Sequence, residues 1–230
     1  NEIAQSECCN GKIFARYWMH NGFLNIDNRK MSKSLGNFRT VREIAKQYDL
    51  QVLRFFMLSA HYRSPLNFSA DLIESSKNAL ERIVDAAGRL RDRKEADKRP
   101  MTESEQSLLK EAEGFRRKFE EAMDDDFNTA DALAAVFELV KFANTNVTEE
   151  STGAFAGAVL DIMVTLSDVL GLIILKKEEV LDKDVEELIQ ERQAARKAKD
   201  FAKADEIRSR LLEMGIELKD TREGVKWKRV

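Results

Sequence analysis

The sequence predicts a mainly α-helical protein built around an antiparallel helical bundle. Three observations predict it: four long segments carry apolar residues at the spacing of one helix face, capping or turn residues separate these segments, and only 2 of the 230 residues are proline. The segments are residues 69–90, 102–123, 129–144 and 150–170. Helices joined by short turns pack antiparallel, so the four segments indicate a bundle.

Composition describes an ordered protein and leaves its partners open. The chain is 43% hydrophobic and 34% charged, which argues against disorder. No apolar run reaches membrane-spanning length, and no signal peptide is visible. The net charge of −3 does not indicate a nucleic-acid partner, although basic residues outnumber acidic ones before Phe68. A protein that is acidic as a whole can still bind RNA on one face.

The cysteines indicate a reducing environment. Cys8 and Cys9 are the only two, and an adjacent pair is not a disulfide framework, so we expect a cytoplasmic protein. Their adjacency also argues against both binding one structural zinc ion. We expect two ordinary, partly buried thiols.

The first 68 residues predict short, mixed elements. Residues 2–9 suit a short helix, the aromatic residues 14–20 suit a buried strand or packed turn, and residues 23–26 suit a strand. A turn follows, and Thr40 with Glu43 forms a capping box, which predicts a helix from Val41. Asp49 then caps a helix whose expected apolar face is Val52, Leu53, Phe56 and Met57.

Local signals divide the bundle and define a separate tail. Thr102 and Glu105 form a second capping box, Asn128 is a cap, and Gly171 ends the last helix. The charged residues 91–99 predict a linker or a frayed helix end, and residues 176–183 predict a second linker. The tail predicts two helices and a β-hairpin, with these residues facing inward on the second helix: Phe201, Ala204, Ile207 and Leu211.

One loop concentrates groups that suit a triphosphate. It reads Lys30-Met31-Ser32-Lys33-Ser34 and continues as Leu35-Gly36-Asn37. Lysine ammonium groups follow phosphate oxygens as charge moves, and hydroxyls and backbone N–H groups add further donors. A solvated surface turn is the alternative for a generic lysine-serine segment. A preceding strand and a following capped helix favour phosphate binding here.

The pentapeptide resembles the KMSKS signature of class I aminoacyl-tRNA synthetases. Further segments are similar to those of the cysteinyl-tRNA synthetases, at residues 1–7, 17–22, 61–66, 123–129 and 192–229. The resemblance implies the end of a Rossmann-type catalytic domain with the KMSKS loop at residues 1–68. It also implies a tRNA-binding helical bundle at residues 69–175 and a small α+β anticodon-binding domain at residues 182–230.

The resemblance implies a two-step reaction on cysteine, ATP with Mg²⁺, and the cysteine tRNA. Cysteine is first converted to cysteinyl adenylate, and the tRNA 3′ end then takes the cysteinyl group. Lys33 is implied to contact the triphosphate as charge builds on the leaving pyrophosphate, with Lys30 in support. Met31, Ser32 and Ser34 complete the implied ATP-binding loop. A monomer without membrane contact is expected.

The family is also similar to zinc enzymes in which the metal binds the thiolate of the cysteine substrate. Glu2 is the one zinc ligand that the resemblance places in this chain. The other ligands, and the His-Ile-Gly-His motif that contacts ATP, would lie before Asn1, and the expectation is that the chain alone does not form adenylate.

By the same resemblance, the implied tRNA anticodon readers are Arg196, Asp205, Asp220 and Trp227. Phe201 is an alternative stacking surface, and Asp205 could instead form a helix pair with Arg208. His61, Tyr62 and Arg63 suit packing, with Arg63 a candidate for an acceptor-stem contact.

Two other functions compete with the ligase. One is a stand-alone module that binds the tRNA anticodon or stem without catalysis. The other is the related ligase that joins cysteine to an amino sugar, against which the anticodon-like tail argues.

Overall fold

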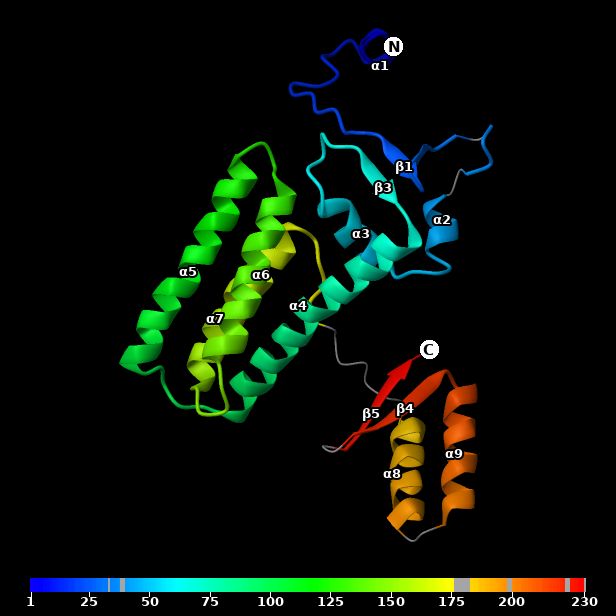
Figure 1. Ribbon diagram of the computed structural model, residues 1–230, viewed down its shortest axis with the longest axis vertical. Helices are drawn as coiled ribbons and strands as arrows, with labels where there is room; N and C mark the ends of the chain where they lie inside the picture. The colour runs from blue at the N-terminus through cyan, green and yellow to red at the C-terminus, as the bar shows by residue number, and fades with distance from the viewer. Residues whose placement is uncertain (33, 38–39, 176–182, 198–199, 222–223, 230) are drawn as a thin grey trace. The chain divides into compact units, whose positions relative to one another are not determined.

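The computed structural model describes residues 1–32, 34–37, 40–175, 183–197, 200–221 and 224–229 (Figure 1). The chain divides into two compact units, Asn1–Lys176 and Lys177–Val230. Within the described ranges, no helix is both long and apolar enough to cross a membrane.

The part of the first unit before the bundle contains a small three-stranded sheet. The elements before the bundle are α1 (Glu2–Asn10), β1 (Leu24–Ile26), β2 (Arg29–Lys30), α2 (Val41–Ile44), α3 (Leu50–Leu58) and β3 (Leu66–Phe68). β1 is central, antiparallel to β2 and parallel to β3. Figure 1 shows β1 and β3 side by side near α3. The predicted helices after Thr40 and Asp49 are confirmed, because each of these side chains accepts a hydrogen bond from the first turn.

The prediction of a buried strand or packed turn at residues 14–20 is wrong. These residues are outside every helix and strand, and their large side chains are exposed: Phe14 46%, Tyr17 90%, Trp18 49% and Met19 53%. An aromatic side chain is buried only where another element covers it, and the described residues do not cover this segment. Met57 of α3 is also 49% exposed, and Phe55 is buried instead.

Four long helices form the predicted bundle. They are α4 (Ala70–Ala96), α5 (Glu103–Asp124), α6 (Thr129–Asn146) and α7 (Gly153–Val169). α4 packs on α7 and α5 packs on α6. Figure 1 shows α5 beside α6. Their shared core contains these fully buried side chains: Ile73, Ile83, Leu139, Phe155, Met163 and Leu166. Burial of each large apolar side chain contributes about 1.5–3 kcal/mol, so this core is the main source of the bundle's stability.

The prediction of a linker or frayed helix end at residues 91–99 is wrong for residues 91–96, which belong to α4, and correct for residues 97–99, which lie in the connection from α4 to α5. α4 continues to Ala96, and Asp97 then accepts hydrogen bonds from Arg93 (2.9 Å), from the backbone N–H of Arg99 (2.8 Å) and from that of Gly153 (3.2 Å). The charged run therefore fastens the end of α4 to the start of α7. The charged residues of this segment predicted solvent exposure. In the structure, Arg93 and Arg99 instead pair with the carboxylate of Asp97.

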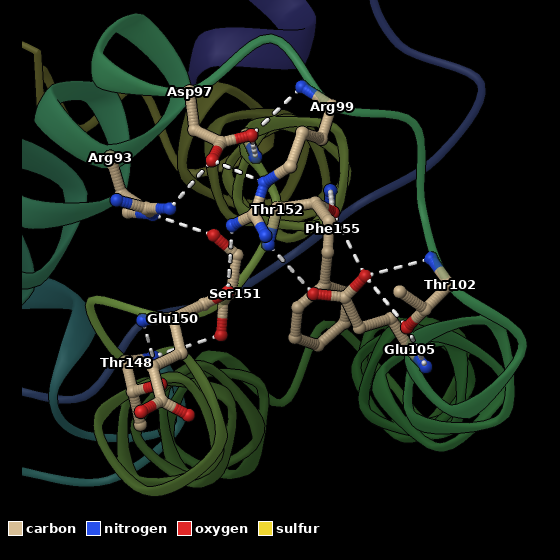
Figure 2. Close-up of polar contacts among 11 residues, drawn as sticks. Arg93, Asp97, Arg99, Thr102, Glu105, Thr148, Glu150, Ser151, Thr152 and Phe155 are labelled. Carbon is tan, nitrogen blue, oxygen red and sulfur yellow. Dashed lines mark hydrogen bonds and ion pairs between the residues drawn. The ribbon is translucent and has the colours of Figure 1, made fainter.

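Glu105 joins the starts of two helices (Figure 2). As the predicted capping box requires, it accepts from the backbone N–H and the hydroxyl of Thr102, the N-cap of α5, at 2.8 and 3.0 Å. It also accepts from the backbone N–H and the hydroxyl of Thr152, the N-cap of α7, at 2.8 and 2.9 Å. We call these four residues, Asp97, Thr102, Glu105 and Thr152, the helix-end network.

The second unit is the predicted pair of helices with a hairpin. It contains α8 (Lys183–Lys197), α9 (Phe201–Glu213), β4 (Ile216–Thr221) and β5 (Gly224–Arg229). β4 and β5 are antiparallel, and the core of this unit is Val185, Ile207, Leu211, Ile216 and Leu218. Phe201 is 61% exposed, so its predicted inward position is wrong. Most of the second predicted linker lies outside the described residues.

Candidate functional site

A tight hairpin presents the lysine loop. β1 and β2 are joined by the two residues Asp27 and Asn28, whose φ angles are +47° and +61°. Positive φ at both central positions is the geometry of two-residue hairpin turns, which Asp and Asn tolerate. The side-chain oxygen of Asn67, in β3, accepts from the backbone N–H of Asn28 at 2.7 Å. The strand that leads into the loop is therefore held from its own turn and from the neighbouring strand.

The loop itself is closed by one asparagine. Asn37 donates from Nδ2 to the carbonyl oxygen of Lys30 (3.1 Å) and accepts at Oδ1 from the backbone N–H of Ser32 (2.9 Å). The hydroxyl of Ser32 accepts from the backbone N–H of Leu35 at 3.2 Å and lies 3.1 Å from the hydroxyl of Ser34. These contacts join the described residues on the two sides of the loop, 30–32 and 34–37.

The predicted loop residues are placed as follows. Lys30 and Ser34 are exposed, Ser32 is half-buried, and Met31 is half-buried against the main core. Lys33, the predicted principal catalytic lysine, lies outside the described residues. Met31 thus anchors the start of the loop, while Lys30 presents its ammonium to solvent. Sequence reasoning did not single out Asn37 or Asn67, because their partners are backbone groups that no side-chain pattern marks.

Glu2, the predicted zinc ligand, is exposed on α1. Its carboxylate lies 3.6 Å from the amino group of Asn1. Among the residues that the structure describes, no three histidine, cysteine or acidic side chains lie close enough together to hold a metal ion. One carboxylate can supply one zinc ligand, but these residues do not assemble a zinc site around it. Cys8 and Cys9 are both exposed, so the expectation of partly buried thiols is wrong.

A cluster around Asp126 joins the segment after α3 to the bundle. Asp126 accepts from the hydroxyl of Tyr62 at 2.8 Å and pairs with Arg63 at 2.9 Å, and Nε2 of His61 lies 3.7 Å away. The hydrogen bond from Arg63 to Tyr62, with the charge of Asp126, raises the pKa of the Arg63 guanidinium. All three residues thus contact the turn between α5 and α6, and the acceptor-stem contact of the exposed Arg63 stays a prediction. The partner, in the turn between α5 and α6, was not predicted.

The predicted anticodon readers lie on different elements of the second unit. Arg196 is exposed near the end of α8, and Asp205 is exposed on α9. No ion pair joins Asp205 to Arg208 in the described part of the chain, so the structure does not use Asp205 in the alternative helix pair. Asp220 and Trp227 belong to β4 and β5, opposite Val225 and Leu218, and their side chains lie outside the described residues.

Three family models match the chain in succession. Residues 1–78 match the class I tRNA synthetase (C) catalytic domain, residues 118–175 match the DALR domain, and residues 178–227 match the cysteinyl-tRNA ligase anticodon binding domain. The cysteine–tRNA ligase of Lachnoclostridium phytofermentans is 61% identical over the whole chain, and that of Clostridioides difficile is 54% identical.

The chain belongs to the cysteinyl-tRNA synthetase family. It spans about half the length of these relatives, since the alignments cover 100% of this chain and 50% of each relative. The fold agrees with the class. An Agrobacterium radiobacter LeuRS, solved in a ternary complex with tRNA and LeuAMS, superposes with a TM-score of 0.54 over 68% of this chain and 23% of its own. At 17% identity, that likeness concerns the fold alone.

Proposed function

We propose that this chain works, within its whole protein, as part of an ATP-dependent cysteine–tRNA ligase. The observation that carries the proposal is the 61% identity to a cysteine–tRNA ligase along the whole chain, including the lysine loop. In the first step a carboxylate oxygen of cysteine attacks the α-phosphorus of ATP. The bond to the leaving pyrophosphate breaks, and cysteinyl adenylate forms. A ribose hydroxyl at the tRNA 3′ end then attacks the cysteinyl carbonyl carbon, and AMP leaves.

The lysine loop would act on the first step. Negative charge builds on the oxygens of the leaving pyrophosphate, and a lysine ammonium placed there is worth more in the transition state than in the ground state. Lys33 and Lys30 are the proposed catalytic residues, and Met31, Ser32 and Ser34 complete the ATP-binding loop. The exposure of Lys30 and the anchoring of Met31 support this assignment.

The rest of the chain would bind the tRNA. We assign residues 1–68 to the catalytic domain, residues 69–175 to stem binding and residues 182–230 to the anticodon. RNA loop bases are read by stacking and by hydrogen bonds to their edges, which suits Arg196, Asp205, Asp220 and Trp227. Exposure of Arg196 and Asp205 supports this role. The protein would act in the cytoplasm as a monomer.

Zinc enters the proposal only through Glu2. This carboxylate would supply one ligand, and the ion would bind the thiolate of the cysteine substrate. Because the described residues do not assemble the rest of that site, we derive no step through the metal.

ATP–pyrophosphate exchange tests the reaction. The full-length protein should catalyse exchange that depends on cysteine, and Lys33→Ala should slow it roughly 10²–10³-fold, as for other groups that stabilise transition-state charge. Lys30→Ala should give a smaller loss. Lys46→Ala, which removes an exposed lysine outside the loop, should leave the rate unchanged. A full-length protein that binds the tRNA but shows no exchange would support the binding module instead.

Titration with cysteine tRNA tests the anticodon assignment. Arg196→Ala should weaken binding of the chain by about tenfold, the order expected when one good base contact is lost. Arg208→Ala, which removes an exposed arginine from α9, should change affinity only through charge, an effect that vanishes as salt rises. Equal effects of the two substitutions at high salt would contradict the role of Arg196.

A further inference from the structure

The side-chain amide of Asn37 makes two hydrogen bonds of the kind that a neighbouring strand makes. In an extended chain, the carbonyl of one residue and the N–H two residues later point to the same edge, where an adjacent strand would donate and accept. At the lysine loop these two groups are the carbonyl of Lys30 and the N–H of Ser32, and both are bonded to the side-chain amide of Asn37. A primary amide carries one donor side and one acceptor, so it satisfies both groups at once.

The loop is shaped so that Asn37 can reach back. Gly36 has a φ of +66°, and a Cβ at this position would have nothing within 4 Å, so glycine is needed there for its backbone conformation. The bond from the Leu35 N–H to the Ser32 hydroxyl closes the turn ahead of it. Asn37 is half-buried, whereas the turn at residues 34–36 is exposed. The contacts of Asn37 therefore lie at the base of the loop.

Fixing this base fixes the origin of the Lys30 side chain. A lysine ammonium sits on a flexible four-carbon stem, so the volume it samples is set by its backbone. The β1–β2 pairing holds Lys30 on its N-terminal side, opposite Asn25. Asn37 holds its carbonyl on the other side, and Met31 packs against the core between the two bonded groups.

We propose that Asn37 is a positioning residue for the lysine loop. It holds the backbone from Lys30 to Ser32 in one conformation before ATP arrives, so that the lysine charge needs little reorganisation as pyrophosphate leaves. This inference rests on the proposed ligase function. Asn37 acts through the backbone of the loop and touches neither ATP nor the reacting atoms.

Two measurements on the full-length protein test the inference. Asn37→Ala should lower kcat for ATP–pyrophosphate exchange by about tenfold, with a smaller change in the KM for ATP, because the loop's charges stay while their placement is lost. Hydrogen exchange at the Ser32 amide should become faster, since its acceptor is removed. Asn37→Gln keeps both amide atoms and should recover part of each effect. Asn78→Ala, which removes an exposed asparagine on α4, is the matched control.

The possible outcomes distinguish the positioning role of Asn37 from the ligase function on which it rests. A wild-type protein without cysteine-dependent exchange would overturn the proposed ligase and the positioning role together. A wild type that exchanges, with an Asn37→Ala variant of equal kcat, would overturn the positioning role alone. An unchanged Ser32 amide in that variant would do the same. Circular dichroism of each variant verifies that it is folded, and Asn37→Gln provides the test should Asn37→Ala not fold.

Discussion

The hydroxyl of Tyr62 donates a 2.8 Å hydrogen bond to Asp126, which lies 64 residues further along the chain. The bond joins the segment after α3 to the turn between α5 and α6. The aspartate lies at a φ of +57°, and Phe127 beside it at +55°, a region that L-residues seldom adopt. Asp and Asn adopt this region most readily among residues with a side chain. An aspartate at position 126 therefore suits both the backbone of the turn and the hydrogen bond from Tyr62.

This relationship predicts coupled effects of substitution at the two positions. Tyr62→Phe and Asp126→Ala should each lower the free energy of unfolding by about 1–2 kcal/mol, because each removes a hydrogen bond to a charged group. Combined, they should cost less than their sum by about 1 kcal/mol, since either change alone breaks the shared bond.

Asp126→Asn is the matched control for the coupling, because it keeps an acceptor and tolerates positive φ. We expect it to cost under about 1 kcal/mol, since the pair with the exposed Arg63 contributes little. Urea unfolding followed by circular dichroism measures all four variants. Additive effects of Tyr62→Phe and Asp126→Ala would show that the bond does not join the two segments energetically.

Glu105 makes a second prediction, because it accepts hydrogen bonds at the starts of α5 and α7. Glu105→Gln turns one acceptor oxygen into an NH₂ donor facing donors, which should cost about 2–4 kcal/mol of unfolding free energy. Glu103→Gln, at an exposed acidic position in the same helical turn, should change stability by less than about 0.5 kcal/mol. Similar losses in the two variants would mean that the buried contacts are not what stabilises these helix ends.

Acid should weaken the helix-end network through Asp97. The pKa of this carboxyl is lowered from 3.8 to about 2, and the largest cause is the hydrogen bond from the backbone N–H of Arg99. The Gly153 N–H and the Arg99 guanidinium lower the pKa further, whereas burial of the carboxyl raises it. A group whose pKa is lower in the folded state stabilises the fold above its unfolded pKa, and that stability is lost as pH falls through the folded value. Stability should therefore decline between about pH 4 and pH 2.

Asp97→Asn should flatten this decline, because asparagine has no carboxyl to protonate. Asp92→Asn, on the exposed side of the same helix, accounts for the loss of one negative charge. Glu105 should add to the same loss of stability in acid, because its pKa is also lowered in the folded protein. Burial raises the pKa of Glu105, but the hydrogen bonds from Thr102 and Thr152 together lower it by more. An unaltered acid profile in Asp97→Asn would assign the decline to other carboxylates.

The sequence predicted what depends on neighbours along the chain. Both capping boxes, the Asn128 cap and the Gly171 stop are signals within one helical turn, and all four are present in the structure. The lysine loop could also be predicted as a phosphate-binding loop, because the groups that suit phosphate lie on consecutive residues. Long apolar stripes were sufficient for the bundle, since four such faces can be buried only against one another.

Contacts between distant residues were beyond the same reasoning. Glu105 looked like an ordinary capping glutamate, and its second partner, Thr152, lies 47 residues away. The aromatic residues near Trp18 predicted burial, yet composition cannot say which element covers them. The charged run ending at Arg99 has the composition of a solvated linker, and only its folded neighbours at Glu150 and Gly153 make it ordered.

Gly153 provides the last prediction, because its backbone touches the helix-end network. A Cβ there would lie 1.9 Å from the carbonyl oxygen of Asp97 and 2.9 Å from that of Lys94, and backbone atoms cannot swing away as a side chain does. Gly153→Ala should therefore lower the free energy of unfolding by about 2–4 kcal/mol through overpacking. Gly88→Ala is the matched control, since a Cβ there meets nothing within 4 Å inside α4. It should stabilise the protein by about 0.5–1 kcal/mol, because alanine favours helix. Urea unfolding that gave both substitutions the same sign would contradict the close approach of α7 to the end of α4.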